Sequence, residues 1–579
     1  MTNSASRAFL LTAAIFLMAG SAHAGKTDMQ TLNVAAPEGS KPASMSNADF
    51  REIESAGMYK NANEGSLGKD LWKGSKRSVL LPLIEDMPVA SREPAVQRLI
   101  FGALLTQADA RMIENDVPIE PGRDLFTLRL EKLIQAGAYR QAQDFYSSFF
   151  EETKPYHERL ARAGLLAMLL NGEKSLACVE ANTLKDNFPE SEFIKQALAF
   201  CDVTLSETPS AASLETMKAL NLGSLDILTA KDAAIVYNPE NFGALSLIEK
   251  AFLAAAHKIN FEKSGITDIR SVPPTHLRIL LSDDSLSEKS RFLLTVAAES
   301  WGLATPGELK DAYRAALPPT GGDLSSLQIP DTAEDWEKIS YNFAIATNTD
   351  DESSRWNAIK NALALSDKLG PAALKPFADI IEKTQPVAVT EMEIEQALRV
   401  LNFAQKPIPG LWLKEIEQLP LDQQKTVKNQ TTYTEKFISE FVKKDGKPEN
   451  SSAELLKASP YESGSRQNYL FKNIIENVDN TAGNSDNAAE IYEKDFGLTF
   501  KQDYVMPTIV VWNHLLEAGQ SGRIGETVVL GASVLQVSEP ENIYPGLFND
   551  VRTSLSNVGL TEISSNLAIA AMLGTIQRN

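Results

Sequence analysis

Residues 124–150 read DLFTLRLEKLIQAGAYRQAQDFYSSFF, and most of the fold prediction rests on them. Their apolar residues recur at steps of three and four, the spacing of one buried face on an amphipathic helix. The first apolar run stops at Gly137, and because glycine has no Cβ it can take the left-handed conformation that ends a helix. A second run, 142–150, follows. The stretch therefore predicts two helices joined by a short turn.

The same pattern returns along the chain. A third apolar run, 160–170, stops at Gly172, which is 35 residues after Gly137. A period in the mid-thirties is typical of stacked helical hairpins. Near the other end of the chain, residues 516–519 (LEAG) repeat the pattern of residues 134–137 (IQAG). The sequence therefore predicts an all-α fold, a superhelical solenoid of antiparallel helix pairs in which each pair packs on its neighbours.

Small residues and prolines within this region carry a family resemblance. Ala142, Ala177 and Pro189 stand at offsets from the two glycines that match tetratricopeptide repeats, so the stretch resembles a pair of degenerate repeats of that family. The family's Trp and its Leu-Gly pair are missing from the first helices. The resemblance implies a concave groove that binds peptides, but the groove positions match no known ligand pattern.

Two short motifs near the ends of the chain carry a second resemblance. Residues 71–74 read LWKG, residues 521–526 read SGRIGE, and residues 558–560 read VGL. This layout resembles a family of secreted proteobacterial helical-repeat proteins. The resemblance implies a fold and a compartment, and it brings no activity with it.

The N-terminus predicts export. Arg7, an apolar run and the small-x-small triplet 22–24 (AHA) form a secretory signal peptide over residues 1–24. Residues 25–70 are rich in Ser, Ala, Asn and Gly and predict a mostly disordered tether. One patch, residues 46–58, is interpreted as a short helix because Ser46 and Asp49 have capping-box spacing. Residues 71–317 and 331–579 predict N-terminal and C-terminal helical-repeat regions, separated by a segment with paired prolines and glycines. The predicted location is periplasmic or secreted.

Composition narrows the classes of molecule that the protein is expected to bind. Without the signal peptide the chain carries 55 basic and 76 acidic residues, a formal charge of −21. That balance argues against nucleic acid, which requires a basic footprint. No later segment has 18 consecutive apolar residues, so we expect no membrane span. The tight basic cluster of Lys73, Lys76 and Arg77 is interpreted as a solvated helix start, with anion binding as the alternative.

The two cysteines, Cys178 and Cys201, flank a turn centred near Pro189. Each stands 11 or 12 residues from that turn, so both lie about 17 Å along their helices at a rise of 1.5 Å per residue. A disulfide across this hairpin is therefore geometrically reasonable and suits an exported protein. Two buried free thiols are the alternative.

The sequence offers little reactive chemistry. The four histidines outside the signal peptide (His157, His257, His276 and His514) are isolated, and residues 479–490 match a calcium loop poorly. We therefore predict no metal, no cofactor and no catalytic residue. The most specific enzyme alternative is a lytic transglycosylase, some of which place a helical superhelix before a Glu-Ser active site. Glu462 and Ser463 form such a pair, but the family's Gly-Leu-Met-Gln stretch does not follow.

These observations predict a non-catalytic scaffold or adaptor of the cell envelope that binds proteins or peptides. Two alternatives remain open. One is a peptidoglycan-acting enzyme with its catalytic acid at Glu462, and the other is a self-assembling secreted structural protein. The sequence predicts neither the partner nor the oligomeric state.

Overall fold

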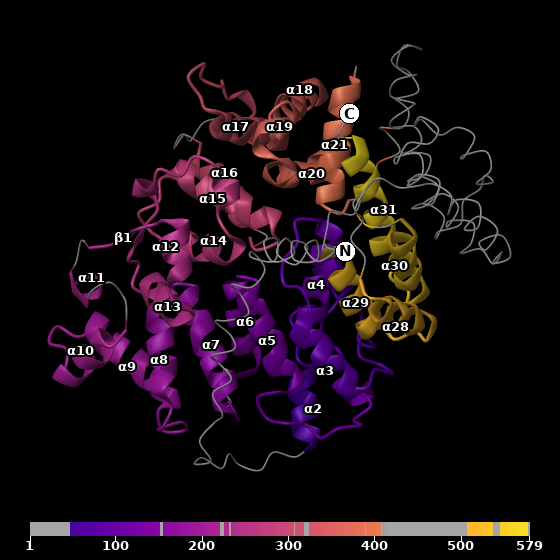
Figure 1. The fold of residues 1–579 in the computed structure, drawn as a ribbon. Coiled ribbons are helices and arrows are strands. Elements are labelled where there is room, and N and C mark those ends of the chain that lie inside the picture. The colour runs from indigo at the N-terminus through magenta and orange to yellow at the C-terminus, as the bar shows by residue number, and fades with distance from the viewer. Residues whose placement is uncertain are drawn as a thin grey trace, which may run out of the picture.

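The computed structural model describes residues 47–150, 155–220, 225–230, 233–305, 307–317, 324–387, 389–406, 409, 412, 507–536, 543 and 545–576. These residues form an all-α protein (Figure 1), as predicted. The part of the chain that is described contains two strands of two residues each, β1 (Ile235–Val236) and β2 (Ile259–Asn260), which pair in parallel.

The helical pairs predicted from the sequence are present. Gly137 (φ +79°) ends the first helix and Gly172 (φ +84°) ends the third, both in the left-handed conformation. Each helix contacts the next in this part of the chain. The helices are α5 (Leu125–Gln135), α6 (Tyr139–Phe150), α7 (Glu158–Leu170), α8 (Lys174–Leu184), α9 (Glu192–Leu205), α10 (Ala211–Lys218) and α11 (Leu225–Thr229).

A second group of helices packs across the first, and the two glycines permit the approach. A Cβ on Gly137 would lie 2.8 Å from the carbonyl oxygen of Pro274, and one on Gly172 would lie 2.8 Å from Cβ of Ser282. One helix, α14, therefore lies against the ends of two successive hairpins. This group comprises α12 (Pro239–Ala244), α13 (Leu247–Ala255), η4 (Glu262–Ser264), η5 (Ile269–Ser271), α14 (Pro274–Leu281), α15 (Glu288–Ser300) and α16 (Glu308–Ala315).

A third group continues from α16. Its last helix begins with a capping box in which Thr390 and Glu393 bond each other's backbone N–H. The group comprises η6 (Leu324–Ser326), α17 (Asp335–Asn348), α18 (Glu352–Leu363), α19 (Ser366–Leu369), η7 (Pro371–Phe377), α20 (Ala378–Ile381) and α21 (Glu391–Phe403).

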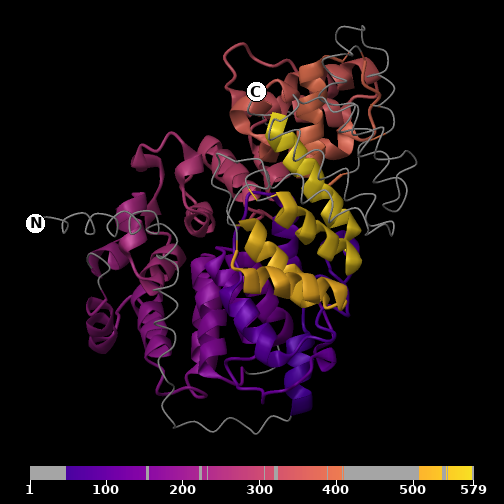
Figure 2. The same ribbon diagram turned by 45° about the vertical axis from the view of Figure 1, so that its right-hand side comes forward.

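The C-terminal helices return to the N-terminal ones. Figure 2 shows α28 (Ile509–Gln520), α29 (Ile524–Gln536), α30 (Pro545–Asn557) and α31 (Thr561–Ile576) lying across α3 (Arg77–Asp86) and α4 (Pro94–Leu105). Helix α29 contacts α3 and α4, and α31 contacts both α4 and α21. The C-terminal helices thus pack on the N-terminal ones, so that the last elements of the chain cover the first.

The closing contact joins two motifs from opposite ends of the sequence. The N–H of Gly525 donates to the carbonyl of Leu71 at 2.7 Å, and a Cβ on Gly525 would lie 2.6 Å from the fully buried ring of Trp72. Arg98 on α4 forms an ion pair with Glu562 on α31 at 2.7 Å. The LWKG and SGRIGE motifs are therefore two sides of one interface.

The prediction of a mostly disordered tether is corrected only for residues 47–70, which are ordered, while residues 25–46 lie outside the described part. The ordered part contains α2 (Asn47–Ser55), within the stretch predicted as a short helix, and η2 (Ala62–Glu64). Glu54 on α2 is fully buried and pairs with Arg77 at 2.6 Å. The composition of the segment is polar, but a few buried side chains with specific partners are enough to hold it.

The same pair corrects the interpretation of the basic cluster as a solvated helix start. Lys73 and Lys76 are exposed, whereas Arg77 is completely buried. The Arg77 guanidinium donates to both carboxylate oxygens of Glu54 and to the side chain of Asn115. The charge of Arg77 can be buried at the start of α3 because each of its three guanidinium nitrogens has a hydrogen-bond partner.

One contiguous apolar core contains side chains from both predicted repeat regions, from Phe50 to Ala571.

The apolar spacing of residues 214–228 and 244–258 is helical, yet neither stretch forms one continuous helix. The first contains parts of α10 and α11, and in the second α13 begins at Leu247, after a capping box formed by Ser246 and Glu249. In the second case the cap chemistry places the helix start more strongly than the apolar spacing does.

Candidate functional site

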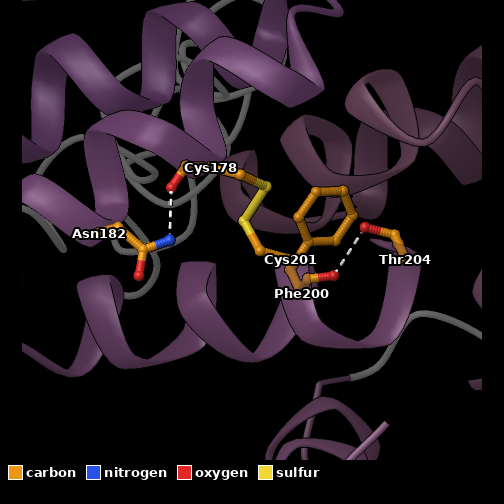
Figure 3. Close-up of a disulfide and its surroundings, with 5 residues drawn as sticks. All are labelled: Cys178, Asn182, Phe200, Cys201 and Thr204. Carbon is orange, nitrogen blue, oxygen red and sulfur yellow. Dashed lines mark hydrogen bonds between the residues drawn. A yellow bond between two sulfur atoms is a disulfide. The ribbon is translucent and has the colours of Figure 1, made fainter. Parts of the chain in front are cut away.

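The predicted disulfide is present. Cys178 on α8 and Cys201 on α9 are bonded, with their Cα atoms 5.7 Å apart. Figure 3 shows the bond between the facing helices, beside two local hydrogen bonds in which Asn182 donates to the Cys178 carbonyl and Thr204 to the Phe200 carbonyl. Both cysteines are buried, so the bond fixes the α8–α9 hairpin from inside. This confirms the disulfide that the equal distances of the two cysteines from the turn predicted.

A pocket of about 330 Å³ lies where the ends of α6 and α7 meet α14, α15 and α16. It follows from the close approach of α14 to the two hairpin glycines, because Gly172 leaves room for Ser282, which lines the pocket. Half of the lining residues are charged, and apolar and small polar residues lie between them. It includes Arg140, Glu173, Arg278, Leu281, Glu308 and Asp311.

The fixed part of the pocket is the pair formed by Arg278 and Glu308. Nη1 of Arg278 donates to both carboxylate oxygens of Glu308 at 2.8 Å, and the N–H of Thr305 donates to the same carboxylate at 2.7 Å. Burial by itself raises the pKa of the Glu308 carboxyl, but Arg278 and Thr305 outweigh it and lower that pKa. The Nε of Arg278 is buried and has no partner. The carboxylate is therefore held ionised inside the pocket wall.

Three other charged groups of the pocket are more available. The Arg140 side chain is 49% exposed, and it forms an ion pair with Glu308 at 3.9 Å, which is too long for a hydrogen bond. Glu173 is exposed, and within the described residues its carboxylate has no hydrogen bond or ion pair. Asp311 pairs with Arg314 at 3.0 Å, and both side chains are at least 70% exposed. An exposed pair of this kind contributes little to stability and exchanges readily.

The third guanidinium of the lining is occupied. Arg291 donates to the carbonyls of Leu281 at 3.3 Å and Asp283 at 3.0 Å, and so ties α15 to the end of α14. The pocket therefore offers one accessible guanidinium, two accessible carboxylates and a floor of small apolar side chains. Such a surface can bind a ligand that carries both signs of charge.

The four isolated histidines each have a partner. The N–H of Arg159 donates to His157, and Nδ1 of His257 donates to the Ser282 carbonyl at 2.7 Å. His276 bonds the Tyr237 hydroxyl at 2.9 Å, and His514 bonds Glu526 at 2.8 Å. The described residues contain no group of three or more His, Cys, Asp or Glu that could hold a metal ion.

The alternative site at Glu462 and Ser463 lies outside the described residues, as does the calcium-loop window 479–490. Sequence reasoning missed the pocket itself. The Glu308 carboxylate accepts from the N–H of Thr305, three residues earlier, and the same carboxylate also holds Arg278, 30 residues away. The capping spacing is local and carries no signal of the second partner.

No family model, no curated protein and no solved structure matches this chain. Within the described ranges, we found no helix that combines the length and the apolar character needed to cross a bilayer.

Proposed function

We propose that the protein is a non-catalytic helical-repeat scaffold of the periplasm, or a secreted one, that binds peptides or peptide segments of envelope proteins. The observation that carries this proposal is the pocket between α6 and α16, in which an arginine–glutamate pair is built into the wall and further charges remain accessible. Pockets of about 300–1,000 Å³ with a few placed polar groups are the usual form of a small binding site.

Three further observations support parts of the proposal. The disulfide suits an oxidising compartment, where such bonds form and persist. The two glycines with positive φ, 35 residues apart, support a solenoid of tetratricopeptide-like hairpins in α5–α9. Helix α15 packs on both α14 and α16 in the pocket wall, and a site formed by helices that are already packed loses less entropy when it binds a ligand.

A peptide array tests the proposal. Protein lacking residues 1–24 is labelled and applied to short peptides of varied charge, and bound peptides are then measured in solution. We expect binding at micromolar concentrations that competes among peptides for a single site. If the protein binds no peptide in the array or in solution, the proposal is wrong. Lysis of cell-wall material that is abolished by Glu462→Gln would favour the enzyme alternative, and concentration-dependent light scattering would favour self-assembly.

A further inference from the structure

The pocket at the junction of α6, α14 and α16 has a charge arrangement that specifies more than peptide binding. Arg140, in the first turn of α6, contributes a guanidinium that is half exposed. Its only described ion pair is the long one to Glu308, and Glu308 is already bonded to Arg278 and Thr305. Arg140 therefore keeps its planar fork of donors for a ligand. Such a fork matches the two oxygens of a carboxylate.

The same pocket is unsuited to a polyanion. Three carboxylates line it, at Glu173, Glu308 and Asp311. A phosphate group with nearly two charges would be repelled by them, and the protein as a whole carries a formal charge of −20. A single carboxylate on Arg140 meets less repulsion. The chemistry thus favours a monoanionic group.

The accessible carboxylates call for a positive group beside that anion. Glu173 is exposed in the turn between α7 and α8, and no ion pair or hydrogen bond to another described residue occupies its carboxylate. Asp311, on α16, also lines the pocket. An ammonium bound beside either residue would be paired with a carboxylate. Leu281 and Ala312 supply apolar surface for a small side chain between the two charges.

We propose that this pocket binds a zwitterionic group, with a carboxylate on Arg140 and an ammonium on Glu173, of the kind a short peptide with free ends carries. The inference rests on the proposed peptide-binding function and narrows its ligand. The pocket volume of about 330 Å³ accommodates a group of two or three small residues. An acidic and a basic side chain that are close together on a longer peptide would present the same chemistry.

The test uses alanyl-alanine as the probe, with its N-acetylated and C-amidated forms as controls, measured by calorimetry. We expect the free dipeptide to bind, and each blocked form to bind roughly ten- to a hundredfold more weakly, because each blocked form loses a charge-assisted hydrogen bond. Arg140→Gln should remove the preference for the free carboxylate, and Glu173→Gln the preference for the free amine. Arg111→Gln removes the same positive charge as Arg140→Gln, from a side chain that is 74% exposed and lies outside the pocket, and it should change neither preference.

A blocked peptide containing Lys and Asp separates the two sources of the zwitterion. If it binds with the same sensitivity to Arg140→Gln and Glu173→Gln, side chains supply the charges and the inference stands. If blocked and free dipeptides bind equally, or if neither variant alters the preference, the inference is overturned. In that case, other peptides that still bind to the Arg140→Gln protein would leave the proposed function intact, and an absence of binding to every peptide would overturn the proposed function as well. Arg140→Lys, which keeps the charge without the fork, should give intermediate binding.

Discussion

Removing the Glu54 carboxylate should destabilise the protein more than any exposed ion-pair change. Glu54 is fully buried and accepts three hydrogen bonds, from Nη1 and Nη2 of Arg77 at 2.7 and 2.6 Å and from the N–H of Leu125 at 2.9 Å. In Glu54→Ala the buried guanidinium keeps only its bond to Asn115. Breaking a buried pair on one side costs about 3–5 kcal/mol, because the remaining charge is uncompensated.

A control pair exists on α3, the helix that carries Arg77. Glu85 also accepts two hydrogen bonds from one guanidinium, that of Arg123, at 2.9 and 3.1 Å, but the two side chains are 32% and 49% exposed. Water screens this pair, so Glu85→Ala should reduce the free energy of unfolding by about 1 kcal/mol or less. Both variants thus remove a carboxylate that accepts two bonds from an arginine, and they differ in burial and in the third bond that Glu54 accepts from Leu125.

Urea unfolding followed by tryptophan fluorescence measures both variants, and limited proteolysis reports on α2 directly. We expect Glu54→Ala to lower the unfolding midpoint and to open residues 47–58 to protease, while Glu85→Ala leaves both nearly unchanged. The double variant Glu54→Leu with Arg77→Met should recover part of the loss, because no buried charge is left unpaired. Equal, small effects of Glu54→Ala and Glu85→Ala would refute the reasoning, since α2 would then not be docked in solution.

Four further predictions address the crosslink, the hairpin turns, a buried histidine and the closing contact. Reducing the disulfide, whose cysteines are 23 residues apart, should cost about 3.4 kcal/mol on the loop-entropy model, measured by urea unfolding with and without reductant. Gly172→Ala should destabilise more than Gly522→Ala, because both have positive φ but only the first Cβ would collide with a neighbour, and the difference in melting temperature measures that collision. Burial lowers the pKa of His276 to about 4, so below pH 6.5 the unfolded chain binds a proton that the folded protein does not. Stability should therefore fall by about 3 kcal/mol between pH 6.5 and 4, and His276→Gln should lose that dependence in pH-dependent unfolding. Gly525→Ala should separate α29 from the ring of Trp72, measured as a shift in its fluorescence and as proteolysis of the C-terminal helices.

Each of these predictions has a result that contradicts it. Unfolding that is unaffected by reductant would show that the crosslinked hairpin is not limiting for stability. Equal losses in the two glycine variants would leave only backbone strain. A wild-type stability that is flat between pH 6.5 and 4 would contradict the burial of His276, and native fluorescence in Gly525→Ala would contradict the closing contact.

Local chemistry made much of the helical content predictable. Gly137 and Gly172 end helices because a residue without Cβ is needed there, and the box of Thr390 and Glu393 starts one because two side chains bond two free N–H groups. The cysteine pair was predictable because two helices of known rise meet at one turn. In each case the physical cause acts within a few residues or within one hairpin.

Contacts between distant residues could not be predicted in this way. Capping spacing favours a short helix around Glu54, but only its contacts with Arg77 and with the start of α5 explain how that helix is held in the core. The closing contact of Gly525 with Leu71 joins residues more than 450 positions apart. Nothing local distinguishes a glycine that packs under a tryptophan from one that merely makes a turn.

The candidate site also depends on contacts between distant residues. Arg140 and Glu308 stand on helices that the sequence places in unrelated hairpins, and the packing of α14 against two glycine turns brings them to one pocket. Helix spacing and caps are properties of a single segment, so they can be identified from the sequence of that segment. How one group of helices packs on another depends on surfaces that form only once the helices have formed. That packing brings the charges of Arg140 and Glu308 into one pocket.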